Sequence, residues 1–255
     1  GKLQDAMPAD SPSVVASTLR AELGPDWKDF IRLHPGPPLG SATIAQVHRA
    51  TLGVRDETGC IRWMEGVVKV QHAHVASCLA VDVAASSFLA LLVSRLMPQL
   101  FPEFRGIVRD LASLTLAELD FTAEAQNQIA ARTSLLGSRL SSRVFVPKVL
   151  TDFVTRRVLA MEFVDGIKIT DLADVNATTT PNTNNPSATP SSSLPPLRDI
   201  VETLVDAFSQ MMVGDVFNCD PHPGNLLVEK SSGRLCLLDW GQARMPSNEE
   251  RLGYA

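Results

Sequence analysis

The sequence predicts an α+β fold in which helix-forming and strand-forming segments alternate in blocks. The chain has 255 residues with 45% hydrophobic content, so it can bury a substantial core. Runs rich in β-branched residues predict strands, and long stretches with apolar residues three and four apart predict helices. We expect a small sheet with added helices in residues 1–163, followed by a mainly helical part in residues 164–255.

Composition and charge exclude several classes of protein. The net charge is −5, without a long run of either sign, which argues against a nucleic-acid partner. The four cysteines form no Cys-x-x-Cys pair, so neither a zinc site nor a disulfide framework is expected. The longest uncharged apolar run, 83–94, has 12 residues, whereas a spanning helix needs about 20, so no transmembrane segment is predicted. The first residues show no targeting peptide.

The first third of the chain is predicted to contain a helix, a loop and a β-hairpin. Apolar residues at helical spacing in 11–33 predict a helix to about Gly24 and helix again beyond it. Three prolines make 34–39 a loop. The runs 40–52 and 61–70 flank a polar turn and therefore predict two paired strands.

Two long helices are predicted next, at about 75–97 and 105–136. The first either packs against its neighbours or docks on a membrane or a partner. In a continuous second helix, at about 100° per residue, Asp120 and Glu124 share a face and Glu118 points about 200° away from Asp120.

The remaining elements lead to a polar motif. Strands are predicted at 144–150 and 157–163, and a helix at 197–214. Between them, residues 174–196 hold 18 Ser, Thr, Asn or Pro in 23 positions, a composition that predicts a disordered insert.

The strongest chemical signal lies in two segments, a predicted catalytic loop at 219–228 and a predicted metal-binding turn at 237–241. They supply Asp220, an Asn five residues later at Asn225, and Asp239 in Asp-Trp-Gly. Protein kinases use this spacing for a proton-accepting Asp and two magnesium ligands. The spacing therefore predicts Asp220 as the catalytic acceptor and Asn225 and Asp239 as metal ligands. Each residue alone is also typical of an ordinary turn.

Upstream residues suit the phosphates of a nucleotide. Lys69 interrupts an apolar strand, which favours a lysine that grips phosphate over an edge-strand lysine facing water. Glu118 is the predicted catalytic partner of Lys69, with a solvated acidic helix face as the alternative. A loop with one glycine, Gly40, precedes the first strand, and the small residues that follow allow close approach of a ligand. The predicted nucleotide-binding residues of this loop are Gly40, Ser41, Ala42 and Thr43.

Six ordered motifs give the chain a resemblance to a known family. They read PLGSATIAQVHRA, VVKVQH, ELDFTAEAQN, LAMEFVDG, CDPHPGN and LLDWGQ. Together they resemble the UbiB-type, ADCK-like atypical kinases associated with coenzyme Q and other prenyl lipids. The resemblance implies a protein-kinase-like two-lobe fold, ATP and Mg²⁺ as cofactors, and nucleotide contacts at the hinge-like residues Glu162 and Val164.

The resemblance also carries expectations about the rest of the protein. It implies an N-terminal Lys-x-Gly-Gln extension that this fragment lacks, and a C-lobe that continues past Ala255. It implies lipid or lipid-biosynthetic partners, peripheral membrane contact, and a mitochondrial or plastid location. The expected function is an atypical kinase or ATPase. A nucleotide-gated scaffold and a metal hydrolase that needs no nucleotide remain as alternatives.

Overall fold

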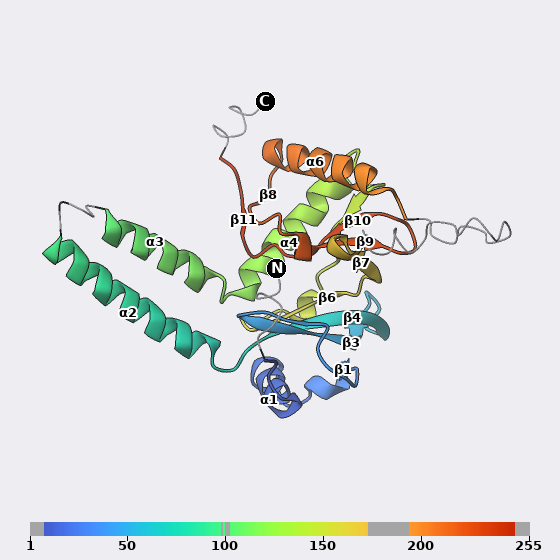
Figure 1. The fold of residues 1–255 in the computed structure, drawn as a ribbon. Helices are drawn as coiled ribbons and strands as arrows, with labels where there is room; N and C mark the ends of the chain where they lie inside the picture. The colour runs from blue at the N-terminus through green and yellow to red at the C-terminus, as the bar shows by residue number, and fades with distance from the viewer. Residues whose placement is uncertain (1–7, 98, 100–102, 173–193, 248–255) are drawn as a thin grey trace, which may run out of the picture. The chain divides into compact units, whose positions relative to one another are not determined.

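The computed structural model describes residues 8–97, 99, 103–172 and 194–247. These residues form two compact units (Figure 1). Unit 1 contains residues up to Thr122 together with Leu150–Ala160, and unit 2 contains Ala123–Val149 and the residues from Met161 onward. The sequence placed the lobe boundary at 163–164 and kept 123–149 in the first lobe, so the two divisions differ. The predicted lobe boundaries stay a prediction.

Unit 1 is built on a five-stranded sheet with the order β1-β3-β4-β6, and β2 pairs with β3. The long pair β3–β4 is antiparallel and joins residues 45–55 to 61–71, which confirms the predicted hairpin. The strands are β1 (Ile31–Leu33), β2 (Gly40–Ser41), β3 (Ala45–Arg55), β4 (Ile61–Gln71) and β6 (Val158–Glu162). Helix α1 (Pro12–Leu23) and the 3₁₀ turns η1 (Trp27–Asp29) and η2 (Thr151–Phe153) complete this part.

One core cluster covers a face of this sheet. Val68 and Val70 of β4 point into the cluster, because alternate residues of a strand face the same side. Leu19 of α1, Trp27 of η1 and Ile31 of β1 are buried in the same cluster. The prediction of a second helical stretch beyond Gly24 was therefore wrong: Ile31 has helical spacing in the sequence, but β1 pairs it with Leu52 on β3.

Two antiparallel helices, α2 (Val75–Leu96) and α3 (Phe104–Ala117), follow β4 and pack side by side (Figure 1). The predicted single helix over 105–136 was wrong, because α3 ends and α4 (Phe121–Leu136) begins after a short turn. The Asp120 carboxylate accepts hydrogen bonds from the Thr122 N–H at 3.0 Å and the Thr122 hydroxyl at 2.5 Å. An acidic side chain in this position starts a new helix by satisfying its first N–H groups.

Unit 2 contains a four-stranded sheet with the order β5-β10-β9-β7, and a two-stranded sheet of β8 and β11. Its strands are β5 (Val144–Phe145), β7 (Gly166–Lys168), β8 (Phe217–Asn218), β9 (Leu226–Glu229), β10 (Leu235–Leu237) and β11 (Ala243–Arg244). Helix α6 (Leu197–Val213) confirms the predicted helix, and the 3₁₀ turns are η3 (Ile169–Asp171) and η4 (Pro223–Asn225). The predicted strand 144–150 is shorter than expected. Most of the predicted insert 174–196 lies outside the described residues.

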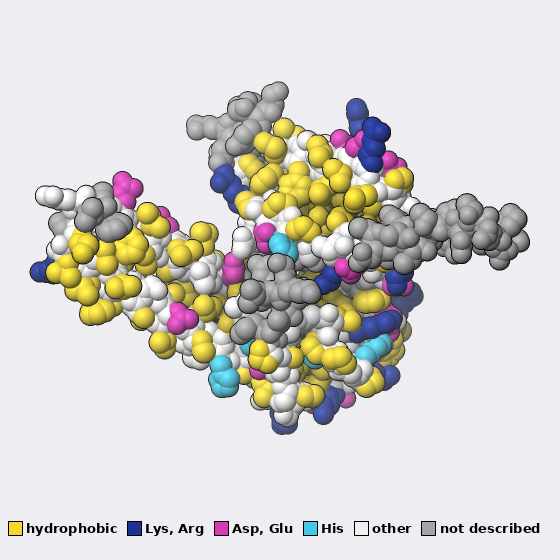
Figure 2. Space-filling view, viewed as in Figure 1, with side chains coloured by type: hydrophobic (Ala, Val, Ile, Leu, Met, Phe, Trp, Pro, Cys, Tyr) yellow, Lys and Arg dark blue, Asp and Glu magenta, His cyan; other side chains and the backbone are white. Residues whose placement is uncertain are grey.

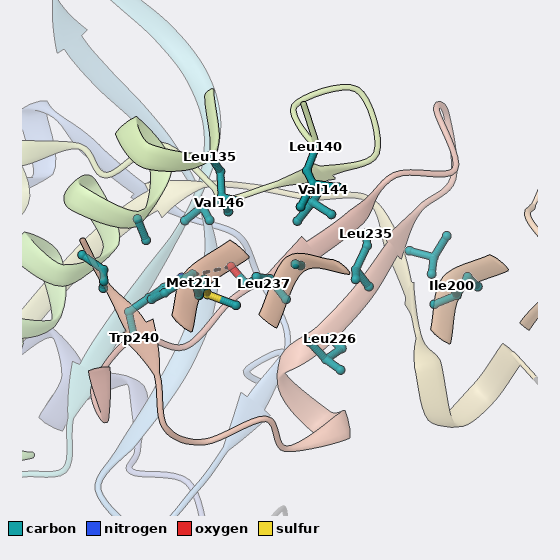
Figure 3. Close-up of a cluster of buried hydrophobic side chains, with 14 of the residues drawn as sticks. Leu135, Leu140, Val144, Val146, Ile200, Met211, Leu226, Leu235, Leu237 and Trp240 are labelled. Carbon is teal, nitrogen blue, oxygen red and sulfur yellow. Dashed lines mark hydrogen bonds between the residues drawn. The ribbon is translucent and has the colours of Figure 1, made fainter. Parts of the chain in front are cut away.

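The core of unit 2 packs helices against the β9–β10 hairpin (Figure 3). Leu226 on β9 and Leu237 on β10 belong to one buried cluster with Leu135 of α4 and Met211 of α6. Trp240 is fully buried there, and its indole N–H donates to the Leu237 carbonyl at 3.3 Å. Leu237 and Trp240, which lie before and after Asp239 in the sequence, are therefore both buried in this core.

Candidate functional site

In unit 2 the three residues of the predicted metal and phosphate face lie on connected pieces of backbone. β9 and β10 form an antiparallel hairpin, and Asn225 precedes it while Asp239 follows it. The Leu238 N–H donates to the Asn225 carbonyl at 3.0 Å, so the two predicted metal ligands come from neighbouring backbone. Asp220, Asn225 and Asp239 are each partly exposed, which leaves their side chains accessible to a ligand.

A buried carboxamide, Asn218, connects the other two residues. Its Nδ2 donates to the Asp239 carbonyl at 2.7 Å, and its Oδ1 accepts from the Asp220 N–H at 2.9 Å. Asn218 is only 5% exposed, so both bonds are shielded from water. Asn218 was not among the predicted site residues. Its position two residues before Asp220, within β8, is the only signal that pointed to it.

The loop after Asp220 is shaped by His222. The His222 Nδ1 accepts a hydrogen bond from the Gly224 N–H at 3.1 Å, and the His222 carbonyl accepts from the Asn225 N–H at 2.9 Å. A Cβ at position 224 would lie 2.9 Å from the His222 Nδ1, so a larger residue there would have to displace the His222 ring. His222 therefore orients the loop that carries Asn225.

The Asp239 carboxylate is held by its own turn. Asp239 Oδ1 accepts from the Gly241 N–H at 2.9 Å. A Cβ on Gly241 would lie 3.3 Å from that oxygen and 3.7 Å from Oε2 of Glu124. Glu124, on α4, is 4% exposed. A buried glutamate thus lies beside the Asp239 turn, which the sequence analysis considered only as a neighbour of Asp120 on one helix face.

These residues fit magnesium by their chemistry. Mg²⁺ prefers oxygen ligands, and it is usually held by one or two protein carboxylates together with substrate phosphates and water. Asp239 and Asn225 supply such oxygens, and Gly241 leaves space beside the Asp239 carboxylate. Among the described residues no group of three His, Cys, Asp or Glu forms a ready-made metal cage. Water and phosphate oxygens could complete the coordination of a metal held by Asp239 and Asn225.

In unit 1, Lys69 lies on the face of the sheet opposite the core. Its neighbours Val68 and Val70 are buried in the core, whereas Lys69 is partly exposed, and its Nζ lies 4.9 Å from the centroid of the Phe121 ring. The register places Val47 opposite Lys69 and Gly40 opposite Val47. The predicted nucleotide loop and Lys69 therefore lie in one row across three strands.

The loop at Gly40–Thr43 closes on its own hairpin. The Ala42 N–H donates to the Ala45 carbonyl at 2.9 Å, and the Leu39 N–H donates to the Val47 carbonyl at 2.8 Å. The Ala42 carbonyl accepts from the Nε2 of His72 at 3.0 Å. The hydroxyl oxygen of Ser41 is buried and makes no hydrogen bond within the described residues. The loop thus offers a polar side-chain group where a Gly-rich loop would offer backbone amides.

The turn between α3 and α4 is tied to the lysine strand. Gln71, two residues after Lys69, is 2% exposed, and its Nε2 donates to the carbonyls of Leu119 at 2.6 Å and Arg156 at 3.1 Å. Glu118 is the C-cap of α3 and Asp120 precedes α4, so the face assignment that assumed one continuous helix was wrong. Asp120 instead caps α4 and lies 3.7 Å from Nε of Arg156.

Of the two predicted hinge residues, Glu162 is the last residue of β6 and Val164 lies two residues beyond it. The Glu162 N–H donates to the Lys148 carbonyl at 2.9 Å, and the Glu162 carboxylate accepts from the Lys148 N–H at 3.2 Å. Val164 is buried. Both residues belong to unit 2, whereas Lys69, Glu118 and the loop at 40–43 belong to unit 1. The roles assigned to these residues stay predictions.

The chain is similar in sequence to known proteins. The sequence profile of the ABC1 atypical kinase-like domain matches residues 2–255. AarF domain-containing protein kinase 1 of Mus musculus is 30% identical over 99% of this chain and 44% of its own length, and the Gallus gallus protein of that name is 29% identical over the same shares. The ABC1 family protein lscO of Purpureocillium lilacinum is 32% identical over 86% of this chain and 36% of its own length.

A solved structure also has this fold. The complex of Rv3197 with erythromycin from Mycobacterium tuberculosis aligns with a TM-score of 0.68 and 22% identity, over 93% of this chain and 53% of that chain. The chain spans less than half the length of the curated relatives described above. With a kinase-like α+β fold and a family profile that matches nearly every residue, the chain belongs to the ABC1 atypical kinase-like domain family.

Proposed function

We propose that this chain binds Mg²⁺-ATP and acts as an atypical kinase or ATPase. The observation that carries the proposal is the bonded set Asp220–Asn218–Asp239, with Asn225 attached through Leu238. In this proposal Asn225 and Asp239 are the magnesium ligands, and the bound metal supplies charge stabilisation at the phosphates. Asp220 accepts the proton of the attacking hydroxyl or water.

Lys69 is the proposed ligand of the nucleotide phosphates. Glu118 is the proposed partner that positions it. If Glu118 has this role, Glu118→Gln should weaken ATP binding about as much as Lys69→Ala does. ATP binding by Glu118→Gln at the level of the parent chain would contradict the assignment of Glu118.

We further propose that the reaction serves coenzyme Q or other prenyl-lipid metabolism in a mitochondrion or plastid. This finer assignment is supported by the six motifs that resemble the UbiB-type family, whose members are associated with prenyl lipids. Relatives named as kinases support the proposal that the chain transfers phosphate. Purified prenyl-phenol head-group compounds should raise ATP turnover, and no change with any of them would argue against this assignment.

The direct test combines ligand stabilisation with turnover. At ATP one hundredfold above its Kd, binding adds about 2.7 kcal/mol to the free energy of unfolding. For a chain of this size that is roughly 5–10 °C in Tm, and the shift should require Mg²⁺. Asp239→Asn should reduce Mg²⁺-dependent ATP turnover by at least about a hundredfold.

Asp199→Asn is the matched control, because Asp199 lies in the exposed first turn of α6, away from the Asp239 turn in the sequence. It should leave turnover unchanged. Turnover by Asp239→Asn at the level of the parent chain would contradict the proposed metal site.

A second function, a nucleotide-gated scaffold, is favoured by one observation. The N–H groups of Leu39 and Ala42 are used within the loop's own hairpin, so fewer amides remain for phosphate. A scaffold predicts the Mg²⁺-dependent Tm shift without turnover in the full-length protein. Turnover of several ATP per minute in that protein would rule it out.

A further inference from the structure

In unit 1, Asp10 connects the segment before α1 to the end of the strand that carries Lys69. The Asp10 carboxylate accepts a hydrogen bond from the Ala73 N–H at 3.0 Å, and the same oxygen lies 3.4 Å from the Nδ1 of His72. The Asp10 N–H donates to the Oε1 of Gln46 on β3 at 2.6 Å. Gln46 is only 1% exposed, so a buried side chain fixes the backbone of Asp10 beside His72.

The His72 ring lies between Asp10 and the predicted nucleotide loop. Its Nδ1 faces the Asp10 carboxylate, and its Nε2 lies 3.0 Å from the Ala42 carbonyl. The His72 side chain is 11% exposed, so both contacts are largely shielded from water. Both partners are acceptors, and an imidazole can donate to both when each of its two nitrogens carries a hydrogen. A histidine at this position can therefore link the two groups.

His72 also reaches the loop through its backbone. The His72 N–H donates to the Ile44 carbonyl at 3.0 Å, next to the contact of the ring with Ala42. Lys69 lies only three residues before His72 in the sequence. These bonds therefore tie the loop at 40–43 to the strand that carries the proposed phosphate ligand.

Helix α2, which follows His72, gives this link little support from packing. By length and composition α2 is apolar enough to cross a membrane, which the uncharged run 83–94 did not predict because that run stops at Asp82 and Arg95. Only 11% of its most apolar window is buried, and Figure 2 shows apolar side chains exposed along α2 and α3. The position of residues 72–74 therefore depends more on hydrogen bonds such as those to Asp10 than on a packed helix.

We propose that Asp10 and His72 form a positioning pair that holds the nucleotide loop at 40–43 in its ATP-binding conformation. This inference rests on the proposed function, which assigns that loop to the nucleotide. The loop would contact the phosphates both before and during phosphate transfer, so the pair contributes equally to binding of the ground state and of the transition state. Loss of the pair should therefore raise the KM for ATP and leave kcat nearly unchanged.

Hydrogen exchange of the full chain without nucleotide tests the pair separately from the ATP proposal. The Ala42 N–H donates to the Ala45 carbonyl, so its exchange rate reports opening of the loop. His72→Phe keeps a ring but removes both nitrogens, and the Ala42 N–H should then exchange about tenfold faster than in the parent chain. Equal rates in His72→Phe and the parent chain would overturn the proposal.

His74→Phe is the matched control. His74 is exposed, lies two residues after His72, and makes no side-chain hydrogen bond as the N-cap of α2. His74→Phe should match the parent chain in the exchange of the Ala42 N–H and in the KM for ATP.

Steady-state kinetics then test whether the pair acts on nucleotide. His72→Phe should raise the KM for ATP about tenfold, with kcat within about twofold of the parent chain. His72→Gln should raise KM less, because its amide nitrogen can still donate to Ala42. Asp10→Ala should also raise KM, and Asp10→Ala/His72→Phe should match His72→Phe because both residues act through one link. The Asp10 side chain is 25% exposed, so Asp10→Ala tests the same link if His72→Phe does not fold.

Three kinetic results would overturn the positioning pair while leaving the proposed function intact. The first is an unchanged KM in His72→Phe, the second is a loss confined to kcat, and the third is a double variant whose KM rises by the product of the two single effects. A parent chain without a Mg²⁺-dependent Tm shift on addition of ATP would instead contradict the proposed function itself.

Discussion

Two buried carboxamides, Asn218 in unit 2 and Gln71 in unit 1, hold the candidate functional residues in different ways. Asn218 bonds directly to the backbone of Asp239 and Asp220, which are themselves proposed to act on ligand. Gln71 bonds to Leu119 and Arg156, so Glu118 and Lys69 are positioned through neighbours. Hydrogen bonds from Asn218 therefore hold the candidate residues of unit 2 directly. In unit 1 the bonds from Gln71 go to residues other than the candidate residues, so they hold Glu118 and Lys69 indirectly.

The largest expected effect comes from removing each carboxamide. Asn218→Ala and Gln71→Ala each remove the partner of two partly buried backbone groups, at about 1–3 kcal/mol per group. Each variant should lose about 2–6 kcal/mol of unfolding free energy, measured by urea denaturation. ATP turnover, measured on the folded fraction, should fall much further in Asn218→Ala, because the Asp220 and Asp239 backbones move apart.

Asn218→Asp sharpens this comparison. An aspartate keeps the acceptor for the Asp220 N–H but loses the donor to the Asp239 carbonyl. Its second carboxylate oxygen would face the Asp239 carbonyl oxygen, so two acceptors would meet at a buried position, and Asn218→Asp should be at least as destabilised as Asn218→Ala. Equal turnover in Asn218→Ala and Gln71→Ala would mean that direct bonding to the candidate residues makes no difference.

The next largest effect is expected from replacing a glycine, and it should differ between Gly241 and Gly40. At Gly241 an added Cβ would lie 3.3 Å from Oδ1 of Asp239, whereas at Gly40 it would meet nothing within 4 Å. Neither position has a positive φ that would exclude alanine. Gly241→Ala should lower ATP turnover at least about tenfold, with little change in Tm, by shifting the Asp239 carboxylate. Gly40→Ala should change Tm by no more than a degree or two.

The smallest expected effect is a pH dependence confined to unit 1. Burial lowers the pKa of His48 from its ordinary value of 6.5. The His48 Nε2 lies 2.7 Å from the Nε2 of Gln46, a contact that needs a neutral ring to accept the amide N–H. The unfolded chain binds a proton more readily, so the free energy of unfolding should fall as the pH drops below about 6.5.

His48→Gln should flatten this dependence between pH 7.5 and 5.5, as measured by Tm across that range. Other groups near this pair include Asp10, whose backbone bonds Gln46 and whose carboxylate lies 3.4 Å from the Nδ1 of His72. His72→Gln is therefore the control for a titration at the neighbouring ring. An unchanged slope in His48→Gln would assign the pH dependence to another group.

Much of the fold followed from periodicity in the sequence. The hairpin of β3 and β4 and the helix α6 were predicted because long runs keep one period and end in clear turn signals. The break at Glu118–Asp120 was missed, since it contains neither Gly nor Pro. An aspartate followed two residues later by Thr122 was the available signal for a helix start.

The candidate site was predictable to the extent that its residues are polar and regularly spaced. Asp220, Asn225 and Asp239 were identified by spacing, and the structure connects them through short backbone links. Asn218, Gln71 and Glu124 were not identified as site residues, because their importance depends on contacts between segments far apart in the chain. A single sequence shows residue types and spacing, but it does not show which carbonyl a buried amide will reach.

The parallel pairing of β5 with β10 has a consequence for synthesis on the ribosome. It joins Val144 to Leu235. Likewise, Ile167 of β7 pairs with Val228 of β9, which is made much later. The sheet of unit 2 therefore cannot close until the ribosome has passed Leu237, nearly a hundred residues after β5 has emerged. During that interval the strands of unit 2 lack their partners, so we expect this half of the chain to need more protection from chaperones than the β3–β4 hairpin, whose strands are only a few residues apart.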